Sequence, residues 1–322
     1  MTLRVLQGGK RRRHYGRVWF AVGAIAVFGA ALAAWHLWPS GGPGSVAPAA
    51  AKPPPKPVRP AVHTRAAEPI LAVRHPLARG LRIGAPAGVL VDAGDGTVLW
   101  AKRPNLRLPI ASTTKIMTAV VALSRLRGRD VVVVDPSVPR VAPFKEGLRA
   151  GEHVKAWKLF YGLLLYSGND DALALAIAAG GTRAQFVALM NEKARALGLK
   201  NTHFRGPSGL IDKDNYSTAW DLAALARFAM WNPRFRTIVR TSVKHVRWAA
   251  PTYAKIYENH NHLLGSYPGA DGIKTGWTTR AKHCLVASAQ RDRARLIAVV
   301  LGSPDAYTDV RKLLNYGFAS RG

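Results

Sequence analysis

The chain has 322 residues, 48% of them hydrophobic, which is enough to bury a sizeable core and excludes disorder throughout. Its 47 lysines and arginines against 18 acidic residues give a formal net charge of +29, which favours anionic partners. A single cysteine, Cys284, cannot form an internal disulfide, and we expect it to be a small buried hydrophobe.

The N-terminus has the pattern of a membrane-targeting segment. Residues 1–17 are basic and carry no acid, and residues 18–38 are uncharged. As a helix the uncharged run would span about 30 Å, which matches the hydrocarbon core of a membrane. A signal peptide cleaved near residues 31–33 is the alternative, but the apolar run is longer than such peptides usually have. Both interpretations place the rest of the chain on the periplasmic, extracytoplasmic side of the cytoplasmic membrane.

Residues 39–81 are expected to form an extended tether. Ten prolines lie between residues 39 and 80 without a periodic apolar pattern, so no core is expected there. Such a tether could hold the following domain, residues 82–322, on the order of 100 Å from the membrane.

The domain itself is basic, with 35 lysines and arginines against 17 acidic residues in residues 82–322. The basic residues are scattered and no nucleic-acid motif is present, so we expect no nucleic-acid partner. Anionic wall polymers or phospholipid headgroups fit an exported domain better, and a solvated surface with no dedicated partner is the alternative. The pair His260 and His262 lacks an acidic or cysteine partner, so the sequence predicts no metal and no cofactor.

Strand patterns lie at both ends of the domain and helical patterns lie between them. Residues 88–92 and 97–101 flank a Gly-Asp-Gly turn and predict a β-hairpin. Apolar spacing predicts further elements: helices over residues 115–126, 156–166, 170–179, 182–197, 218–230 and 308–318, and strands over residues 284–290 and 295–301. The predicted class is therefore α/β (α+β), a mixed antiparallel sheet closed by both chain ends plus a helical lobe.

The first chemically suggestive run is Ser112-Thr113-Thr114-Lys115, at the start of a predicted helix. Ser112 and Lys115 are three residues apart, so they share one helical face and their side chains can touch. A serine hydroxyl becomes a good nucleophile when a neighbouring base takes its proton. Lys115 can be that base only if its pKa falls through burial and nearby cations, for which Lys274 is a candidate. A serine and a lysine that merely flank a helix are the alternative.

Two further runs supply complementary groups. Ser167-Gly168-Asn169 lies in a break between two helices, where Ser167 can relay a proton and Asn169 can bind both the base and a substrate carbonyl. Lys274-Thr275-Gly276 is predicted to lie on an edge strand, where Lys274 and Thr275 offer a cation and a hydroxyl to a carboxylate. Gly276 would let a substrate backbone lie close. Taken singly, each run is also compatible with an ordinary turn or strand.

Together the motifs resemble the low-molecular-mass penicillin-binding proteins, the D-alanyl-D-alanine carboxypeptidase family (serine peptidase family S11). The segments that carry this resemblance span about residues 84–319: residues 109–119, 167–170, 190–191, 194–198, 201–204, 208–210, 217–222, 271–276 and 313–318. The resemblance implies a β-lactamase/transpeptidase-like fold. It also implies a hydrolase that releases the terminal D-alanine of peptidoglycan stem peptides and that β-lactam antibiotics acylate.

By this resemblance, Ser112 is the acylated nucleophile and Lys115 its base. Ser167 and Asn169 form the second catalytic element. The substrate-binding residues implied by the resemblance are Lys274, Thr275, Gly276 and Thr278. The backbone N–H groups of Ser112 and Trp277 would form the oxyanion hole.

Two positions depart from the family pattern. Lys282 stands where the family usually has glycine, and aligning the C-terminal helix puts Ala306 near the place of an arginine that supplements carboxylate binding. A weaker carboxylate site keeps a D,D-endopeptidase that cleaves cross-links as the alternative function. A β-lactamase is disfavoured because Glu192 and Glu258 lack the context of a deacylating glutamate. A non-catalytic wall-binding module is a further alternative, which the three intact motifs disfavour.

Overall fold

The computed structural model describes residues 71–72, 80–210, 214–248 and 253–320. The predicted basic N-terminus, residues 1–17, and the predicted anchor, residues 18–38, lie outside the described residues, as does most of the tether 39–81. Some residues within the predicted tether belong to the packed domain. Leu71 is buried in the core, and Ala72 exchanges backbone hydrogen bonds of 3.0 and 2.9 Å with Gly96 and Val98. The expectation that no core forms in this segment is therefore wrong at Leu71, because its apolar side chain is held against the hairpin by this backbone pairing.

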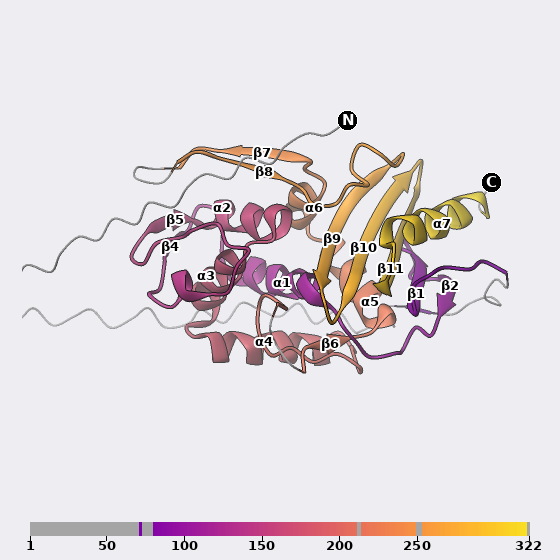
Figure 1. Ribbon diagram of the computed structural model, residues 1–322, viewed down its shortest axis with the longest axis horizontal. Helices are drawn as coiled ribbons and strands as arrows, with labels where there is room; N and C mark the ends of the chain where they lie inside the picture. Colours follow the sequence, from indigo (N-terminus) through magenta and orange to yellow (C-terminus); the bar gives the residue numbers. More distant parts are fainter. Residues whose placement is uncertain (1–70, 73–79, 211–213, 249–252, 321–322) are drawn as a thin grey trace, which may run out of the picture. The chain divides into compact units, whose positions relative to one another are not determined.

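A five-stranded antiparallel sheet forms the centre of the domain, in the order β2-β1-β11-β10-β9 (Figure 1). The strands are β1 (Ala87–Asp92), β2 (Val98–Lys102), β9 (Ala270–Thr278), β10 (Lys282–Arg291) and β11 (Ala294–Ser303). The N-terminal strand β1 pairs with β11 from the C-terminal part, so the predicted closure of the sheet by both chain ends is confirmed. β9 lies at the edge, as the Lys274 motif predicted.

Both faces of the sheet are covered by helices. Alternate residues of a strand point to opposite faces, and this period divides β11 between two cores. Val299 packs in the core that includes α1 (Lys115–Arg125) and α5 (Ala219–Met230), whereas Val300 packs in the core that includes α7 (Ala306–Ala319). Because both faces are buried, β11 reads as a continuous apolar run rather than an alternating one.

The helical lobe holds α1, α2 (Ala156–Tyr161), α3 (Asn169–Gly180), α4 (Arg183–Ala196) and α6 (Pro233–Val239). The helix predicted over 156–166 ends early as an α-helix and continues as the π-helix η3 (Gly162–Tyr166). α6 and three small sheets were not predicted from the sequence. The small sheets are β3 (Leu108–Pro109) with β6 (Tyr216–Ser217), β4 (Val131–Val133) with β5 (His153–Lys155), and β7 (Val243–Val246) with β8 (Lys255–Glu258).

Among the residues that the structure describes, no single helix is long and apolar enough to cross a membrane. Within these same ranges one bent pair, α3 and α4 at 84°, passes on length and composition.

Candidate active site

A cavity of about 290 Å³ brings residues of all three runs together. Its wall includes Ser112 from the first run, Ser167 and Asn169 from the second, and Thr275 and Gly276 from the third. These residues come from a helix start, an interhelical loop and the edge strand β9. The structure therefore gathers in one place motifs that are far apart in the sequence.

Ser112 lies on a short 3-10 helix, η1 (Ala111–Thr114), that leads directly into α1. The turn is fixed by its own threonines, because Thr113 Oγ1 donates to Ile110 O at 2.7 Å and Thr114 Oγ1 donates to Ala111 O at 2.8 Å. The helix start predicted for Ser112 is thus present, with one tighter turn before the α-helix. This geometry keeps Ser112 and Lys115 on the same face.

Lys115 is fully buried, and its side-chain nitrogen contacts three oxygen atoms. Lys115 Nζ lies 3.1 Å from Ser112 Oγ, 2.9 Å from Asn169 Oδ1 and 3.0 Å from Ser208 O. The backbone carbonyl of Ser208 is a site group that motif reasoning did not identify. Its only sequence signal is the Ser208-Gly209-Leu210 segment, which shares the family resemblance.

Asn169 is oriented by the segment that precedes β5. Its Nδ2 donates to Pro143 O at 2.6 Å and its backbone N–H donates to Phe144 O at 2.9 Å, so Oδ1 is turned toward Lys115. Ser167 ends η3 in the left-handed region, with φ 71°, which turns the chain sharply into α3. The predicted interhelical loop is therefore present.

Two glycines allow backbone segments to approach the turn that carries Ser112. A Cβ on Gly276 would lie 2.9 Å from Ser112 N, and one on Gly209 would lie 2.1 Å from Ala111 O. The predicted reason for Gly276 was close approach of a substrate backbone. The structure adds a second reason, because β9 itself passes close to the backbone of Ser112.

The substrate-binding residues predicted on β9 do not all face this cavity. Thr275 lines it, whereas Lys274 is buried and its Nζ donates to Thr275 O at 3.0 Å. Burial lowers the pKa of Lys274 to about 7. Thr278 lines an adjoining cavity of about 430 Å³, and its Oγ1 accepts a hydrogen bond from Ala281 N at 3.0 Å.

Trp277 and Cys284 also contribute to the wall of the first cavity. Trp277 is 55% exposed, and its backbone follows Gly276, which abuts Ser112. Cys284 is buried, as predicted, and burial raises the pKa of its thiol to about 11. A thiol with so high a pKa is almost entirely protonated at neutral pH, so Cys284 is a poor candidate for a nucleophile.

The two departures from the family pattern both lie near the site. Lys282 adopts φ 55°, a left-handed conformation that favours glycine. The end of the cavity at Ala306 is lined by Tyr307, His260 and His283. Tyr307 donates to His260 O at 2.8 Å.

The histidines near this end are engaged with aromatic rings. His262 stacks on Tyr307 with ring centroids 5.5 Å apart, and His260 lies 6.0 Å from the ring of Tyr166. Burial, and to a lesser extent the charge of Lys274, lower the pKa of His260. Within the described ranges no group of three or more His, Cys, Asp or Glu residues has the arrangement of a metal site.

The antiparallel sheet is covered by helices on both faces, and a buried lysine contacts a serine at a helix start. This combination defines a serine peptidase of the penicillin-binding class. The family model for D-alanyl-D-alanine carboxypeptidase, peptidase family S11, matches residues 73–305. The chain belongs to this family, which confirms the resemblance of its motifs.

Known relatives agree with this assignment. The chain is 38% identical over 278 residues to a D-alanyl-D-alanine carboxypeptidase of Streptomyces sp. strain K15, covering 80% of this chain and 94% of the relative. It is 35% identical to the D-alanyl-D-alanine carboxypeptidase DacF of Bacillus subtilis, covering 73% of this chain but 62% of that protein. The crystal structure of the Streptomyces K15 DD-transpeptidase aligns with a TM-score of 0.69 at 37% identity, covering 75% of this chain and all of that one. These likenesses confirm the predicted transpeptidase-like fold.

Proposed function

We propose that this protein is a serine-type D-alanyl-D-alanine carboxypeptidase that removes the terminal D-alanine from peptidoglycan stem peptides. The observation that carries the proposal is the contact of 3.1 Å between Lys115 Nζ and Ser112 Oγ at the wall of a cavity. Family membership and the names of the relatives support the same substrate class.

The geometry supports a two-step reaction. Neutral Lys115 takes the proton of Ser112 as Oγ attacks the carbonyl carbon of the penultimate D-alanine. The peptide bond to the terminal D-alanine breaks, and its nitrogen receives a proton from Lys115 through the hydroxyl of Ser167. Water then hydrolyses the ester on Ser112 and releases the shortened peptide. Asn169 holds Lys115 in place during both steps, because its Oδ1 accepts the hydrogen bond of 2.9 Å.

The edge strand provides the binding groups in this proposal. Thr275 offers a hydroxyl to the terminal carboxylate, and the buried Lys274 next to it in sequence offers positive charge when protonated. Thr278 binds the substrate from the adjoining cavity. The N–H groups of Ser112 and Trp277 stabilise the oxyanion, because the close approach at Gly276 sets these two backbones side by side.

Covalent labelling tests the nucleophile. A β-lactam acylates the same serine, so a fluorescent penicillin is expected to label the protein, and Ser112→Ala is expected to abolish the label. Asn169→Ala leaves the serine in place and should slow labelling without abolishing it. Labelling of the folded Ser112→Ala variant at the unaltered rate would refute the assignment.

A D,D-endopeptidase is the second candidate, favoured by the cavity end near Ala306. Tyr307 and His283 line this end without an arginine between residues 303 and 307, which would weaken the demand for a free carboxylate. Mass spectrometry of digested peptidoglycan separates the two functions. Loss of one alanine from pentapeptides supports the carboxypeptidase, whereas conversion of cross-linked dimers to monomers supports the endopeptidase.

We further propose that residues 18–38 anchor the protein in the cytoplasmic membrane, with the catalytic domain on the periplasmic side. The basic residues 1–17 and the uncharged run support this topology. The domain's positive charge supports contact with anionic wall polymers. If the anchor exists, the full chain remains in the membrane pellet after an alkaline wash and a chain lacking residues 1–38 does not. Recovery of both forms in the supernatant would overturn the anchor.

A further inference from the structure

A buried carboxyl group lies directly behind the loop that carries Ser167 and Asn169. Asp171, in the first turn of α3, is fully buried. Its Oδ2 would lie 2.0 Å from a Cβ on Gly168 and 2.4 Å from one on Gly162. The carboxyl group therefore fills the space that two glycines leave open beneath the loop and the π-helix.

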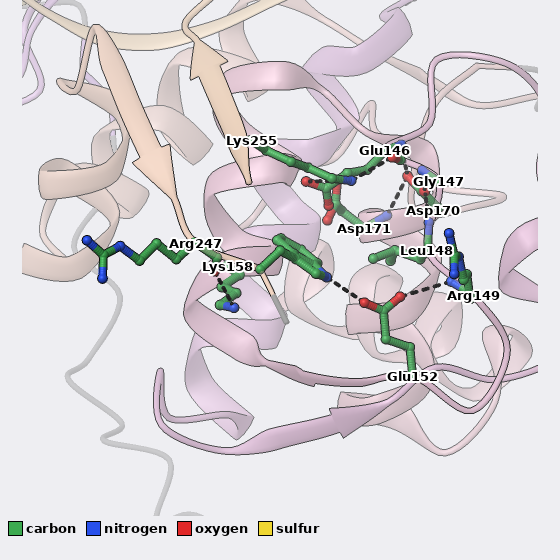
Figure 2. A network of polar contacts seen from close by, with 11 residues as sticks. Glu146, Gly147, Leu148, Arg149, Glu152, Lys158, Asp170, Asp171, Arg247 and Lys255 are labelled. Atoms are coloured by element: carbon green, nitrogen blue, oxygen red, sulfur yellow. Dashed lines mark hydrogen bonds and ion pairs between the residues drawn. The ribbon is translucent and has the colours of Figure 1, made fainter. Parts of the chain in front are cut away.

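Glu146 meets Asp171 in this space, and Figure 2 shows the two side chains together with Lys255. The Glu146 side chain is 1% exposed. Within the described part of the chain, all four oxygens of the two carboxyl groups are buried and accept no hydrogen bond. Lys255 Nζ lies 3.6 Å from Glu146 Oε1 but donates its short hydrogen bond, 2.6 Å, to the main-chain oxygen of Glu146. Two carboxylates in contact would therefore lack a donor, and a proton held between them would supply one.

The carboxylate of the neighbouring Asp170 differs from this pair because it has hydrogen-bond donors. Its carboxylate accepts backbone N–H groups of Glu146 at 2.8 Å, of Gly147 at 2.8 Å and of Leu148 at 3.1 Å. Among the described residues its oxygens therefore have donors, unlike those of the other two carboxyl groups, and its charge raises the pKa of both. Lys255 from β8 lies beside the pair, and Lys158 from α2 is a second cation, whose charge interacts with Glu146.

Burial raises the pKa of Glu146 to about 7 and raises the pKa of Asp171 well above its usual range, with the charges of Glu146 and Asp170 adding to the effect on Asp171. Lys255 opposes the rise on both. Two carboxyl groups in contact in a medium of low dielectric constant do not both ionise, so one proton stays with the pair. We place this proton on Asp171, because Lys255 lies beside Glu146 and favours the carboxylate form of Glu146.

We propose that Asp171 stays protonated and donates a hydrogen bond to the Glu146 carboxylate, and that this pair positions Asn169 for catalysis. Glu146 closely follows Pro143 and Phe144, whose carbonyls hold the side chain and backbone of Asn169. Asp171 follows Asn169 by two residues on α3. The pair thus joins the two segments that together direct Asn169 Oδ1 toward Lys115. Glu146 and Asp171 are positioning residues, and this role depends on the Ser112–Lys115 chemistry proposed above.

Infrared spectroscopy tests the proton without relying on activity. The Ser112→Ala protein is expected to show the carbonyl band of a protonated carboxylic acid at neutral pH, and the band is expected to disappear when Asp171→Asn is added. Asp221→Asn is the matched control, because Asp221 is another buried carboxyl whose pKa is raised, and it accepts hydrogen bonds from Asn201 and Thr202. Absence of the band, or its survival in Asp171→Asn, would overturn the shared proton.

Stability against pH gives a second readout. The pKa of Asp171 is higher in the folded chain than the unfolded value of about 4, so its contribution to stability is lost as pH rises above about 4 toward the folded value. Asp171→Asn keeps a neutral donor and removes this loss. Its stability relative to the unaltered protein should therefore rise from pH 5 to pH 8. A difference that is constant with pH would contradict a protonated Asp171.

Penicillin acylation tests the positioning role. Penicillin should acylate Asp171→Asn at a rate within about twofold of that of the unaltered protein. It should acylate Asp171→Ala more slowly, by about tenfold or more, because small displacements of reacting groups are costly. Circular dichroism establishes that each variant is folded, and Asp221→Asn should acylate at the unaltered rate. Equal acylation by folded Asp171→Ala would refute positioning while leaving the proposed peptidase intact. Failure of every form to acylate would instead contradict the proposed function, and the infrared result would still decide the proton.

Discussion

Gly276→Ala is a direct test of how closely β9 approaches the nucleophile. The added Cβ would lie 2.9 Å from Ser112 N, 3.1 Å from Ile110 O and 3.1 Å from Ala111 Cβ. Ordinary van der Waals contact begins near 3.4 Å, so the strand or the turn must move by a few tenths of an ångström. Two of the three contacts are backbone atoms, which cannot rotate away. We expect a cost of about 1–3 kcal/mol in unfolding free energy from overpacking.

The same displacement should also slow catalysis. A displacement of about 1 Å can cost about 100-fold in rate, so a shift of a few tenths should slow acylation by about tenfold. Stopped-flow acylation by a fluorescent penicillin, with thermal unfolding in parallel, measures both effects. Gly128→Ala is the control, because its single close contact is with Trp157 Cβ at 3.3 Å, away from the cavity. A Gly276→Ala variant that acylates at the unaltered rate would refute the close approach.

Four other expectations concern three residues at or near the cavity. Because burial lowers the pKa of Lys274 to about 7, its charge is lost as pH rises through 7; KM for a peptide with a free carboxylate should increase from pH 6 to pH 8, and Lys274→Arg, which stays charged, should flatten this increase. The pKa of Lys274 is lower in the folded chain than in the unfolded chain, so the free energy of unfolding should rise with pH between about 7 and 10. If urea unfolding of Lys274→Met showed the same pH dependence as the unaltered protein, this expectation would be contradicted. Cys284→Ala should retain acylation, and thiol reagents should leave the native protein active, because this thiol is buried with a pKa of about 11; rapid inactivation by such a reagent would count against its burial. Lys282→Gly should raise the unfolding free energy by about 1 kcal/mol, because φ 55° is strained for a residue with a Cβ, and a lower melting temperature would disprove that strain.

The sheet and most helices could be predicted from the sequence because their signals are local. β11 and α7 carry continuous or periodic apolar residues, and their bounds lie within a few residues of those expected. The short strands β4 and β7 could not be found in this way. Each has three or four residues and exposed apolar side chains, such as Val131 and Val243, and is defined by its partner strand rather than by its own pattern.

The candidate site likewise has parts that could be predicted from local sequence and parts that could not. Ser112, Lys115, Ser167 and Asn169 belong to runs whose chemistry can be read from the residues, and the structure brings them together. The carbonyl of Ser208 could not be predicted, because a main-chain oxygen has no residue type and depends on how distant segments meet. The burial of Lys274 was also not predicted, because the pairing of β9 within the sheet decides which of its side chains point into the core.

The antiparallel pairing of β1 with β11 affects the order in which the domain can assemble. Val89 lies opposite Val299, so the strand made first must wait for almost the whole domain to be synthesised before its partner appears. Until then β1 has β2 on one side and an open edge on the other, with apolar residues on both of its faces. Such long-range contacts slow folding and leave the early chain prone to wrong pairing. The nascent hairpin is therefore where a chaperone would have most to protect.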